Sequence, residues 1–213
     1  MRRVALIGAD DLGRTVAGHL AARNDLELAG FFDDTKTAET VCGKPVLGGL
    51  DRVAGMYAED RFDGVVITIG YRHLAFRAEL FSRLQQAGVS LERVVHPGCH
   101  LGTGVELGEG TILFPGCILD VRAQIGANSI LYPGCNIAHD AIVGAHVIVS
   151  AGVLVAGFTR IEPMSFLGIG TVVSDHLTLG VGCQTGSGAV VVRDVPERTV
   201  VAGVPARATR RLE

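Results

Sequence analysis

A histidine followed directly by an acidic residue stands out as a pair that could carry out acid–base chemistry. His139 and Asp140 are adjacent, and Gly157 lies eighteen residues further along the chain. A carboxylate beside an imidazole orients the ring and raises its basicity, as a general base requires. The backbone N–H of a nearby glycine could stabilise an oxyanion formed during acyl transfer. Taken alone, these residues fit an ordinary surface histidine at a turn equally well.

A six-residue repeat determines where these residues lie. Over residues 95–196, every sixth residue is a branched aliphatic with one exception, and the fifth position of each block is almost always small or β-branched. This period is typical of a hexapeptide β-helix, and three blocks would form one triangular coil. We expect both positions to point inward. Residues eighteen apart should stack, so Gly157 should lie above His139 at an outward-facing corner and leave an open spot for a thioester.

One corner of each coil is marked by glycine. A turn that requires positive φ favours this residue because it has no Cβ. The general preference for right-handed crossovers does not predict the hand of such a helix. The corner glycines, each eighteen residues apart, are Gly98, Gly116, Gly134, Gly152, Gly170 and Gly188.

The composition excludes several classes of partner. The chain has 213 residues and a net charge of −3, so no basic surface is expected for nucleic acid. It has no apolar run of membrane-spanning length and no apparent leader, which predicts a cytoplasmic protein without a membrane partner.

The cysteines and histidines do not form a predicted metal site. Four of the five cysteines occupy the inward small position, where they should act as small buried hydrophobes rather than as metal ligands or disulfides. The histidines lack the short spacing of a zinc site, so no metal is expected.

The first 92 residues do not follow the hexad. Their apolar runs alternate between strand and helix patterns, which predicts a small parallel sheet of the Rossmann type before a β-helix domain at 93–213. We expect strands at Arg3–Gly8, Leu26–Phe32 and Gly64–Gly70, and helices at Arg14–Arg23 and His73–Ala87.

The first predicted turn resembles a dinucleotide-binding fingerprint only in part. It keeps Gly8 and Gly13 but lacks the middle glycine, and Asp33 lies where a ribose-binding acid is expected. Asp10 and Asp11 would repel a pyrophosphate unless they point away. The turn therefore favours a reduced nucleotide or sugar site over full dinucleotide binding, or a turn that only requires its glycines.

Motifs along the whole chain resemble one family. A short Rossmann-like domain followed by a left-handed β-helix is similar to the bacterial sugar O- and N-acyltransferases of the sialic-acid and bacillosamine (NeuD/PglD-like) type. The matching motifs are Ile7-Gly8-Ala9, Asp33-Asp34, Ile69-Gly70 with Arg77, Val95-His96-Pro97, Ile137-Ala138-His139-Asp140, Ser187-Gly188-Ala189-Val190-Val191 and Gly203-Val204-Pro205-Ala206-Arg207.

The resemblance implies a role for each matching residue. His139 matches the general base and Asp140 its acidic neighbour. The family's enzymes are homotrimers, with the active site between subunits, and they transfer an acetyl group from acetyl-CoA to an amine or hydroxyl of a sugar or nucleotide sugar. Positions for acetyl-CoA are Gly157, Ile169 and Ser187, with Ile148 nine residues after the base. Positions for the nucleotide sugar are Asp10, Asp11, Leu12, Asp33, Asp34 and Gly70.

The departures from the family fall mainly in the N-terminal domain, which is expected to bind the acceptor. The histidine common in the family's first turn is replaced here by acids, and Tyr71-Arg72-His73 follows Gly70 where short polar residues are usual. Ile148 stands where some members have a second histidine. The alternatives are therefore acyl transfer to a non-nucleotide amine or alcohol, or a non-catalytic β-helix used for assembly or ligand sensing.

Overall fold

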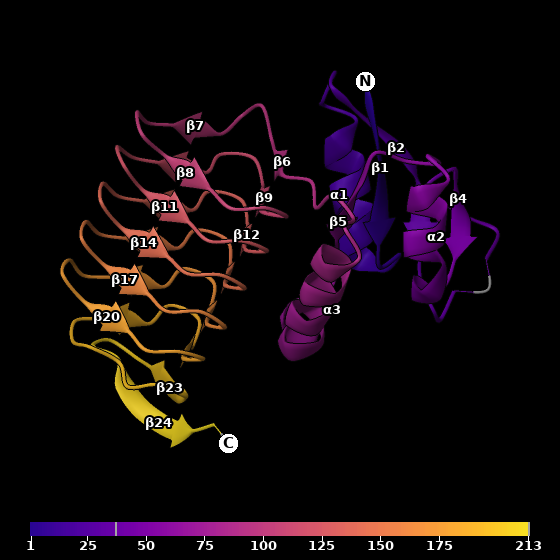
Figure 1. Ribbon diagram of the computed structural model, residues 1–213. Helices are drawn as coiled ribbons and strands as arrows, with labels where there is room; N and C mark the ends of the chain where they lie inside the picture. The colour runs from indigo at the N-terminus through magenta and orange to yellow at the C-terminus, as the bar shows by residue number, and fades with distance from the viewer. Residues whose placement is uncertain (37, 213) are drawn as a thin grey trace. The chain divides into compact units, whose positions relative to one another are not determined.

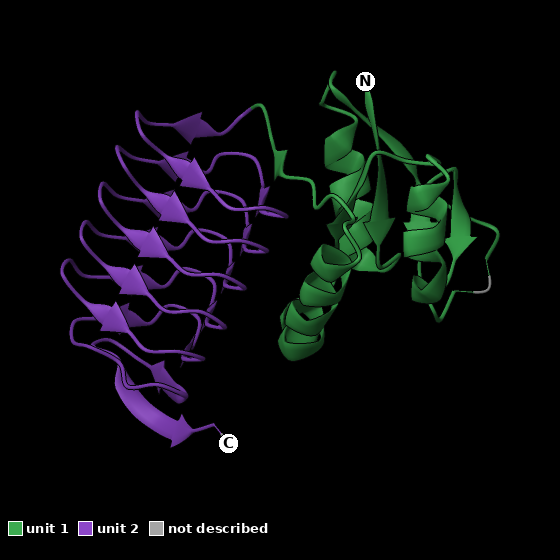
Figure 2. Cartoon of the chain, in the orientation of Figure 1, with its two compact units in different colours: residues 1–97 green, residues 98–213 purple. Residues whose placement is uncertain are grey.

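The computed structural model describes residues 1–36 and 38–212. The chain divides into two compact units, Met1–Pro97 and Gly98–Glu213, coloured separately in Figure 2. The boundary predicted between residues 92 and 93 lies a few residues before this division.

The first unit is built on a mostly parallel sheet of order β3-β4-β2-β1-β5 (Figure 1). Among the described strands of this sheet, β3 and β4 form the one antiparallel pair. The strands are β1 (Arg2–Ile7), β2 (Leu26–Phe32), β3 (Thr40–Val41), β4 (Lys44–Gly48) and β5 (Gly64–Ile67). The helices are α1 (Asp11–Leu20), α2 (Val53–Ala58) and α3 (Leu74–Gln86), with short 3₁₀ turns at Leu50–Arg52 and Tyr71–His73. The predicted Rossmann-type sheet is confirmed.

Some elements differ from the prediction for identifiable reasons. Helix α1 begins at Asp11 rather than Arg14, because an acidic first turn suits the positive end of the helix dipole. The β3–β4 hairpin and α2 were not predicted. β3 has two residues, β4 contains Pro45, and α2 spans six residues, so none of them shows a clear apolar period.

The two retained glycines of the first turn are required by packing. A Cβ at Gly13 would lie 2.0 Å from the carbonyl oxygen of Gly8, and one at Gly8, whose φ is +106°, would lie 2.9 Å from the carbonyl oxygen of Thr68. The turn therefore brings α1 and the end of β5 against β1 without any ligand being needed to explain its glycines.

The second unit is a parallel β-helix whose strands stack in three faces; β8, β11, β14, β17 and β20 form one visible column in Figure 1. Face one contains β7 (His100–Leu101), β10 (Ile118–Leu119), β13 (Asn136–Ile137), β16 (Leu154–Val155), β19 (Val172–Val173) and β22 (Val190–Val191). Face two contains β8 (Glu106–Leu107), β11 (Gln124–Ile125), β14 (Ile142–Val143), β17 (Arg160–Ile161) and β20 (Thr178–Leu179).

Face three ends in a hairpin. It contains β9 (Ile112–Leu113), β12 (Ile130–Leu131), β15 (Ile148–Val149), β18 (Phe166–Leu167), β21 (Gln184–Thr185), β23 (Thr199–Ala202) and β24 (Arg207–Arg211), the last antiparallel to β23. The short strand β6 (Val94–Val95) belongs to the first unit.

The interior of the β-helix follows the predicted register. From Leu113 to Val191, the side chains at the first hexad position are at most 3% exposed. Earlier first positions are less covered: Leu101 is 41% exposed, and Val95 and Leu107 are half-buried. The cysteines at the fifth position are free thiols that face inward, and the Sγ atoms of Cys117 and Cys135 donate to the carbonyls of Tyr132 and Ser150. They act as small core residues, as predicted.

Each corner of the prism contains a residue in the left-handed conformation. The edge between faces three and one, here called the glycine edge, has Gly116, Gly134, Gly152, Gly170 and Gly188 at φ of 66–76°. The edge between faces one and two, here called the histidine edge, has Arg122, Asp140, Phe158 and His176 at φ of 56–59°. Asn128, His146 and Met164 occupy the remaining edge.

Gly134→Val should lower the Tm because it places a β-branched residue at a φ of 74°. The left-handed conformation costs an L-residue about 1–2 kcal/mol, and each kcal/mol corresponds to about 2–4 °C in a chain of this size. A Cβ at Gly134 would meet no atom within 4 Å, so the effect is torsional. Gly134→Asn is the control, since asparagine tolerates this conformation. An unchanged Tm for the valine variant in thermal unfolding would contradict the turn assignment.

Candidate active site

The predicted base and its acidic neighbour are in hydrogen-bond contact. His139 follows β13, and Nδ1 of its imidazole lies 3.0 Å from Oδ2 of Asp140. An ionised carboxylate only accepts, so Nδ1 carries the proton of the neutral ring and Nε2 keeps its lone pair. The imidazole is half-exposed, at 48%. The pair therefore presents a proton-accepting nitrogen at the surface of the β-helix.

The carboxylate of Asp140 has a second partner. Arg122, one coil earlier on the same edge, donates from Nε to Oδ1 at 2.7 Å and from Nη2 to Oδ2 at 2.8 Å. The hydrogen bonds from Arg122 first, and from His139 second, lower the pKa of Asp140 to about 2. Asp140 is therefore ionised throughout the pH range in which a histidine changes charge.

Gly157 provides the surface on which the imidazole lies. A Cβ built on Gly157 would be 2.9 Å from Cε1 and 3.0 Å from Nε2 of His139. The expected stacking is present, but the space left by the missing side chain is filled by the ring and is not open for a thioester. The absence of a side chain at Gly157 thus permits the observed position of the imidazole.

Two aromatic rings extend the histidine edge beyond His139. The Phe158 ring meets His139 edge-on with centroids 5.2 Å apart, and it stacks on His176 at 4.8 Å with an interplanar angle of 12°. Phe158 is 51% exposed and has a φ of 57°, an uncommon combination for a bulky residue. These contacts were missed from the sequence, although the eighteen-residue spacing of Asp140, Phe158 and His176 was a usable signal.

The residues predicted to contact acetyl-CoA do not all lie together within one chain. Ile169, 61% exposed, and Ser187 precede left-handed glycines on the glycine edge, where the N–H of Gly188 donates to the carbonyl of Ile169 at 2.7 Å. Gly157 lies on the histidine edge instead. Face one separates the glycine edge from the histidine edge. Ile148, on β15 of face three, is only 1% exposed.

The acidic residues predicted to bind the acceptor gather at the carboxyl ends of β1 and β2. This edge of a parallel sheet is where ligands of such folds bind. Oδ2 of Asp33 accepts from the N–H of Ala9 at 2.8 Å, and Oδ1 of Asp34 accepts from the N–H of Leu50 at 2.8 Å. Burial opposes ionisation of Asp33, but hydrogen bonds from Ala9 and Thr35 lower its pKa overall. Both carboxylates therefore brace the loops at this edge.

Asp10, Asp11 and Leu12 follow β1. Oδ1 of the exposed Asp10 lies 2.5 Å from Nζ of Lys36, so an ion pair offsets one of the two acids in the turn. Asp11 is exposed and Leu12 half-buried in the first turn of α1. This arrangement removes part of the repulsion that the sequence predicted for a phosphate.

Gly70 lies beyond the end of β5, at the start of a 3₁₀ turn, and a Cβ there would meet no atom within 4 Å. The fully buried Arg77 of α3 donates to the carbonyls of Ile67 and Ile69. It thereby fixes the end of β5 that carries Gly70.

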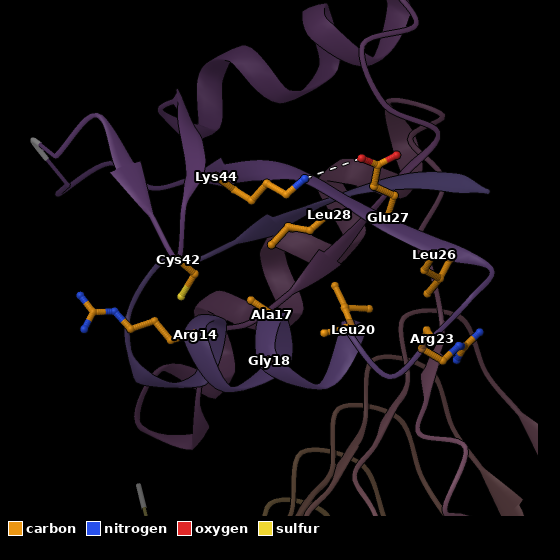
Figure 3. A pocket seen from close by; sticks show the side chains of 11 residues that line it. Arg14, Ala17, Gly18, Leu20, Arg23, Leu26, Glu27, Leu28, Cys42 and Lys44 are labelled. Carbon is orange, nitrogen blue, oxygen red and sulfur yellow. Dashed lines mark ion pairs between the residues drawn. The ribbon is translucent and has the colours of Figure 1, made fainter.

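A pocket of about 430 Å³ lies elsewhere in the first unit, between α1, β2 and the β3–β4 hairpin (Figure 3). Ala17, Leu28 and Cys42 line it, and Nζ of Lys44 lies 3.6 Å from Oε1 of Glu27 at its rim. None of the residues predicted to bind the acceptor lines this pocket.

The described residues contain neither a cluster of possible metal ligands nor a membrane-spanning helix. Among residues 1–36 and 38–212, no group of three or more His, Cys, Asp or Glu side chains is placed to hold a metal ion. No helix in these ranges has the length and hydropathy needed to span a membrane.

Comparison with known proteins matches both units to described families. Residues 3–84 match the PglD N-terminal domain, and residues 122–157 match the bacterial transferase hexapeptide family of six repeats. The sequence also matches a stretch of 53 residues, at 43% identity, in 2,3,4,5-tetrahydropyridine-2,6-dicarboxylate N-acetyltransferase of Enterococcus faecalis. That match covers 25% of this chain and 23% of the relative, so the chain spans about a quarter of the curated relatives it matches.

Two solved structures are similar over nearly the whole chain. A mutant of perosamine N-acetyltransferase from Caulobacter crescentus, in complex with CoA and GDP-perosamine, is 28% identical over 97% of this chain and 96% of its own, with a TM-score of 0.91. The acetyltransferase domain of PglB from Neisseria gonorrhoeae, in complex with acetyl coenzyme A, is 26% identical over 98% and 99%, with a TM-score of 0.88.

These similarities confirm a left-handed β-helix after a Rossmann-like domain. The N-terminal unit thus matches the PglD N-terminal domain, the β-helix matches the hexapeptide transferases, and the predicted resemblance to the PglD/NeuD-like sugar acyltransferases is confirmed.

Proposed function

We propose that this protein is an acetyltransferase that moves the acetyl group of acetyl-CoA to a sugar or nucleotide sugar, with His139 as general base. The observation that carries the proposal is the Asp140–His139 pair, whose Nε2 is left free to accept a proton. A scaffold has no need for a carboxylate-oriented imidazole lying on a glycine backbone. The similarity to acetyltransferases over nearly the whole chain supports the same activity.

The chemistry follows from the orientation of the ring. Nε2 of His139 takes a proton from the acceptor while the acceptor nitrogen or oxygen attacks the thioester carbonyl. The carbon–sulfur bond of the resulting tetrahedral adduct then breaks, and CoA leaves as a thiolate that takes up the proton held by the imidazolium of His139. Asp140 stabilises the imidazolium that forms, and a general base of this kind contributes about 10²–10⁴-fold to the rate. Both similar structures carry the acetyltransferase name, and the perosamine enzyme transfers to nitrogen, which supports an amine acceptor.

The donor site requires more than one subunit in this proposal. Ile169 and Ser187 lie on the glycine edge, whereas His139 and Gly157 lie on the histidine edge, on the other side of face one. A channel between two adjacent β-helices would bring one edge of each together, as in a homotrimer. The exposed Ile118 (44%) and Leu154 (46%) give face one an apolar surface for such a contact. The burial of Ile148 argues against its direct contact with the donor.

The acceptor site is assigned to the carboxyl edge of the N-terminal sheet, at Asp10, Asp11, Leu12, Asp33, Asp34 and Gly70. The GDP-perosamine complex of the similar enzyme supports a nucleotide-linked amino sugar. The Asp10–Lys36 pair makes a diphosphate compatible with the acidic turn, because it offsets one carboxylate. Free thiols and the use of acetyl-CoA suit the cytoplasm, where we place the reaction.

A thiol-release assay with acetyl-CoA and paired acceptors tests the function. The pairs are nucleotide-linked amino sugars and the corresponding free amino sugars, with simple amines as a third group. We expect CoA release with the nucleotide-linked group. Release only with free acceptors would mean that the N-terminal unit has been repurposed, and no release across the panel would favour a scaffold.

A further inference from the structure

We propose that Arg122 is a positioning residue for the acid–base pair, which fixes the Asp140 carboxylate and sets the pH range in which His139 works. This inference rests on the proposed function. It concerns a residue that lies outside the family motifs found in the sequence and is separated from Asp140 by one full coil.

The geometry makes Arg122 the main anchor of the carboxylate. Its Nε and Nη2 atoms donate to Oδ1 and Oδ2 of Asp140, at 2.7 and 2.8 Å. Oδ2 also accepts a hydrogen bond from Nδ1 of His139 at 3.0 Å. A planar guanidinium that binds both oxygens fixes the rotation of the carboxylate. Without this fork, the hydrogen bond from Nδ1 of His139 alone would hold the carboxylate, and its orientation would be less well fixed.

The register of the β-helix places the arginine. Arg122 and Asp140 are both in the left-handed conformation on the histidine edge, at φ of 59° and 57°. The N–H of Arg122 donates to the carbonyl of Thr103, and that of Asp140 to the carbonyl of Val121. Backbone stacking thus holds the two Cα atoms in register before any side chain interacts.

The charges around the imidazole determine the direction of the effect. Asp140 faces His139 directly. Arg122 lies on the other side of Asp140, and the negative charge of Asp120 also attracts its guanidinium. On the far side, Phe158 separates His139 from His176, whose Nε2 is 3.9 Å from Oδ2 of Asp175. Arg122 offsets the negative charge of Asp140, so it restrains the stabilisation of the imidazolium by that carboxylate.

Removing Arg122 and removing Asp140 should therefore shift the acid limb of the kcat/KM–pH profile in opposite directions. Arg122→Gln leaves the Asp140 charge uncompensated, which favours the imidazolium, so the midpoint should rise by about half a pH unit at low salt, a modest shift because the arginine is exposed. Asp140→Asn removes the charge and should lower the midpoint. Loss of orientation should also reduce kcat of Arg122→Gln by about tenfold.

The test measures these profiles for wild type, Arg122→Gln, Arg122→Lys, Asp140→Asn and the double variant Arg122→Gln/Asp140→Asn. Arg122→Lys should have a midpoint close to that of wild type, because lysine keeps the positive charge. Its kcat should recover only in part, because an ammonium group cannot make the two parallel hydrogen bonds of the guanidinium. In the Asp140→Asn background, Arg122→Gln should cause no further loss of kcat, since the arginine positions the imidazole through the Asp140 carboxylate. Arg160→Gln, an exposed arginine on face two, is the matched control.

The outcomes separate this inference from the proposed function. An unmoved acid limb in Arg122→Gln, with or without a loss of rate, overturns the role of Arg122. An equal loss of kcat on Arg122→Gln in the Asp140→Asn background also overturns it, because the arginine would then not act through the carboxylate. Full activity of His139→Ala would instead overturn the proposed function.

Discussion

His139→Ala should lower kcat by about 10³-fold while leaving the Tm and the affinity for CoA near their wild-type values. The imidazole is half-exposed, so its removal leaves no cavity in the core of the β-helix. What is lost is the proton acceptor Nε2, and general base catalysis by a histidine is worth about 10²–10⁴-fold. Steady-state thiol release, thermal unfolding and CoA titration measure the three quantities.

The matched control for this variant is His100→Ala. His100 is exposed on β7 of the first coil and lies far in register from the His139–Asp140 pair. It should retain the wild-type rate. A His139→Ala variant within threefold of wild type would show that His139 is an ordinary corner residue, which is the interpretation that the sequence alone could not exclude.

Gly157→Ala should lower kcat by about 10²-fold with little change in Tm. The added Cβ would lie 2.9 Å from Cε1 and 3.0 Å from Nε2 of His139, closer than such contacts allow, so the imidazole must turn away. The backbone of Gly157 does not have a positive φ, and the ring can move into solvent. The Cβ would also lie 3.2 Å from the carbonyl oxygen of His139, which needs a backbone shift of only a few tenths of an ångström, so the fold should tolerate the methyl group. A displacement of a catalytic group by about 1 Å can cost about 10²-fold in rate.

Gly18→Ala is the control for this substitution, because a Cβ at Gly18 would meet no atom within 4 Å. It should keep the wild-type rate. The Gly157→Ala variant should also lose the hydrogen bond between Nδ1 and Asp140, which a histidine NMR titration would detect as an altered ring environment. A fully active Gly157→Ala variant would mean that the observed ring position is not the working one.

The β-helix and the His139–Gly157 stacking were predictable because the hexad converts position in sequence directly into position in space. Once three blocks make a coil, any residue lies above the one eighteen positions earlier, so the corner that contains His139 followed from counting. The sequence did not predict that the imidazole of His139 fills the space beside Gly157, because the direction of a side chain at a corner depends on its rotamer. The separation of Ile169 and Ser187 from His139 was implicit in the same register.

Other parts of the site could not be predicted because their spacing carries no period. Asp33 and Asp34 were identified as acids at a strand end, but their bonds to Ala9 and Leu50 depend on loops that the sequence does not fix. The Asp10–Lys36 pair joins two different loops. By contrast, Arg122 and Phe158 lie eighteen residues from Asp140, and a search for opposite charges or aromatic rings at that spacing would have found them.

The most direct test of the central claim follows an isotopically labelled acetyl group from acetyl-CoA to a nucleotide-linked amino sugar, using wild type and His139→Ala in parallel. Mass spectrometry of the acceptor reports the transfer itself rather than thioester hydrolysis. We expect labelled product with wild type and almost none with His139→Ala in the same time. Equal labelling by both proteins, or CoA release without a labelled acceptor, would contradict it.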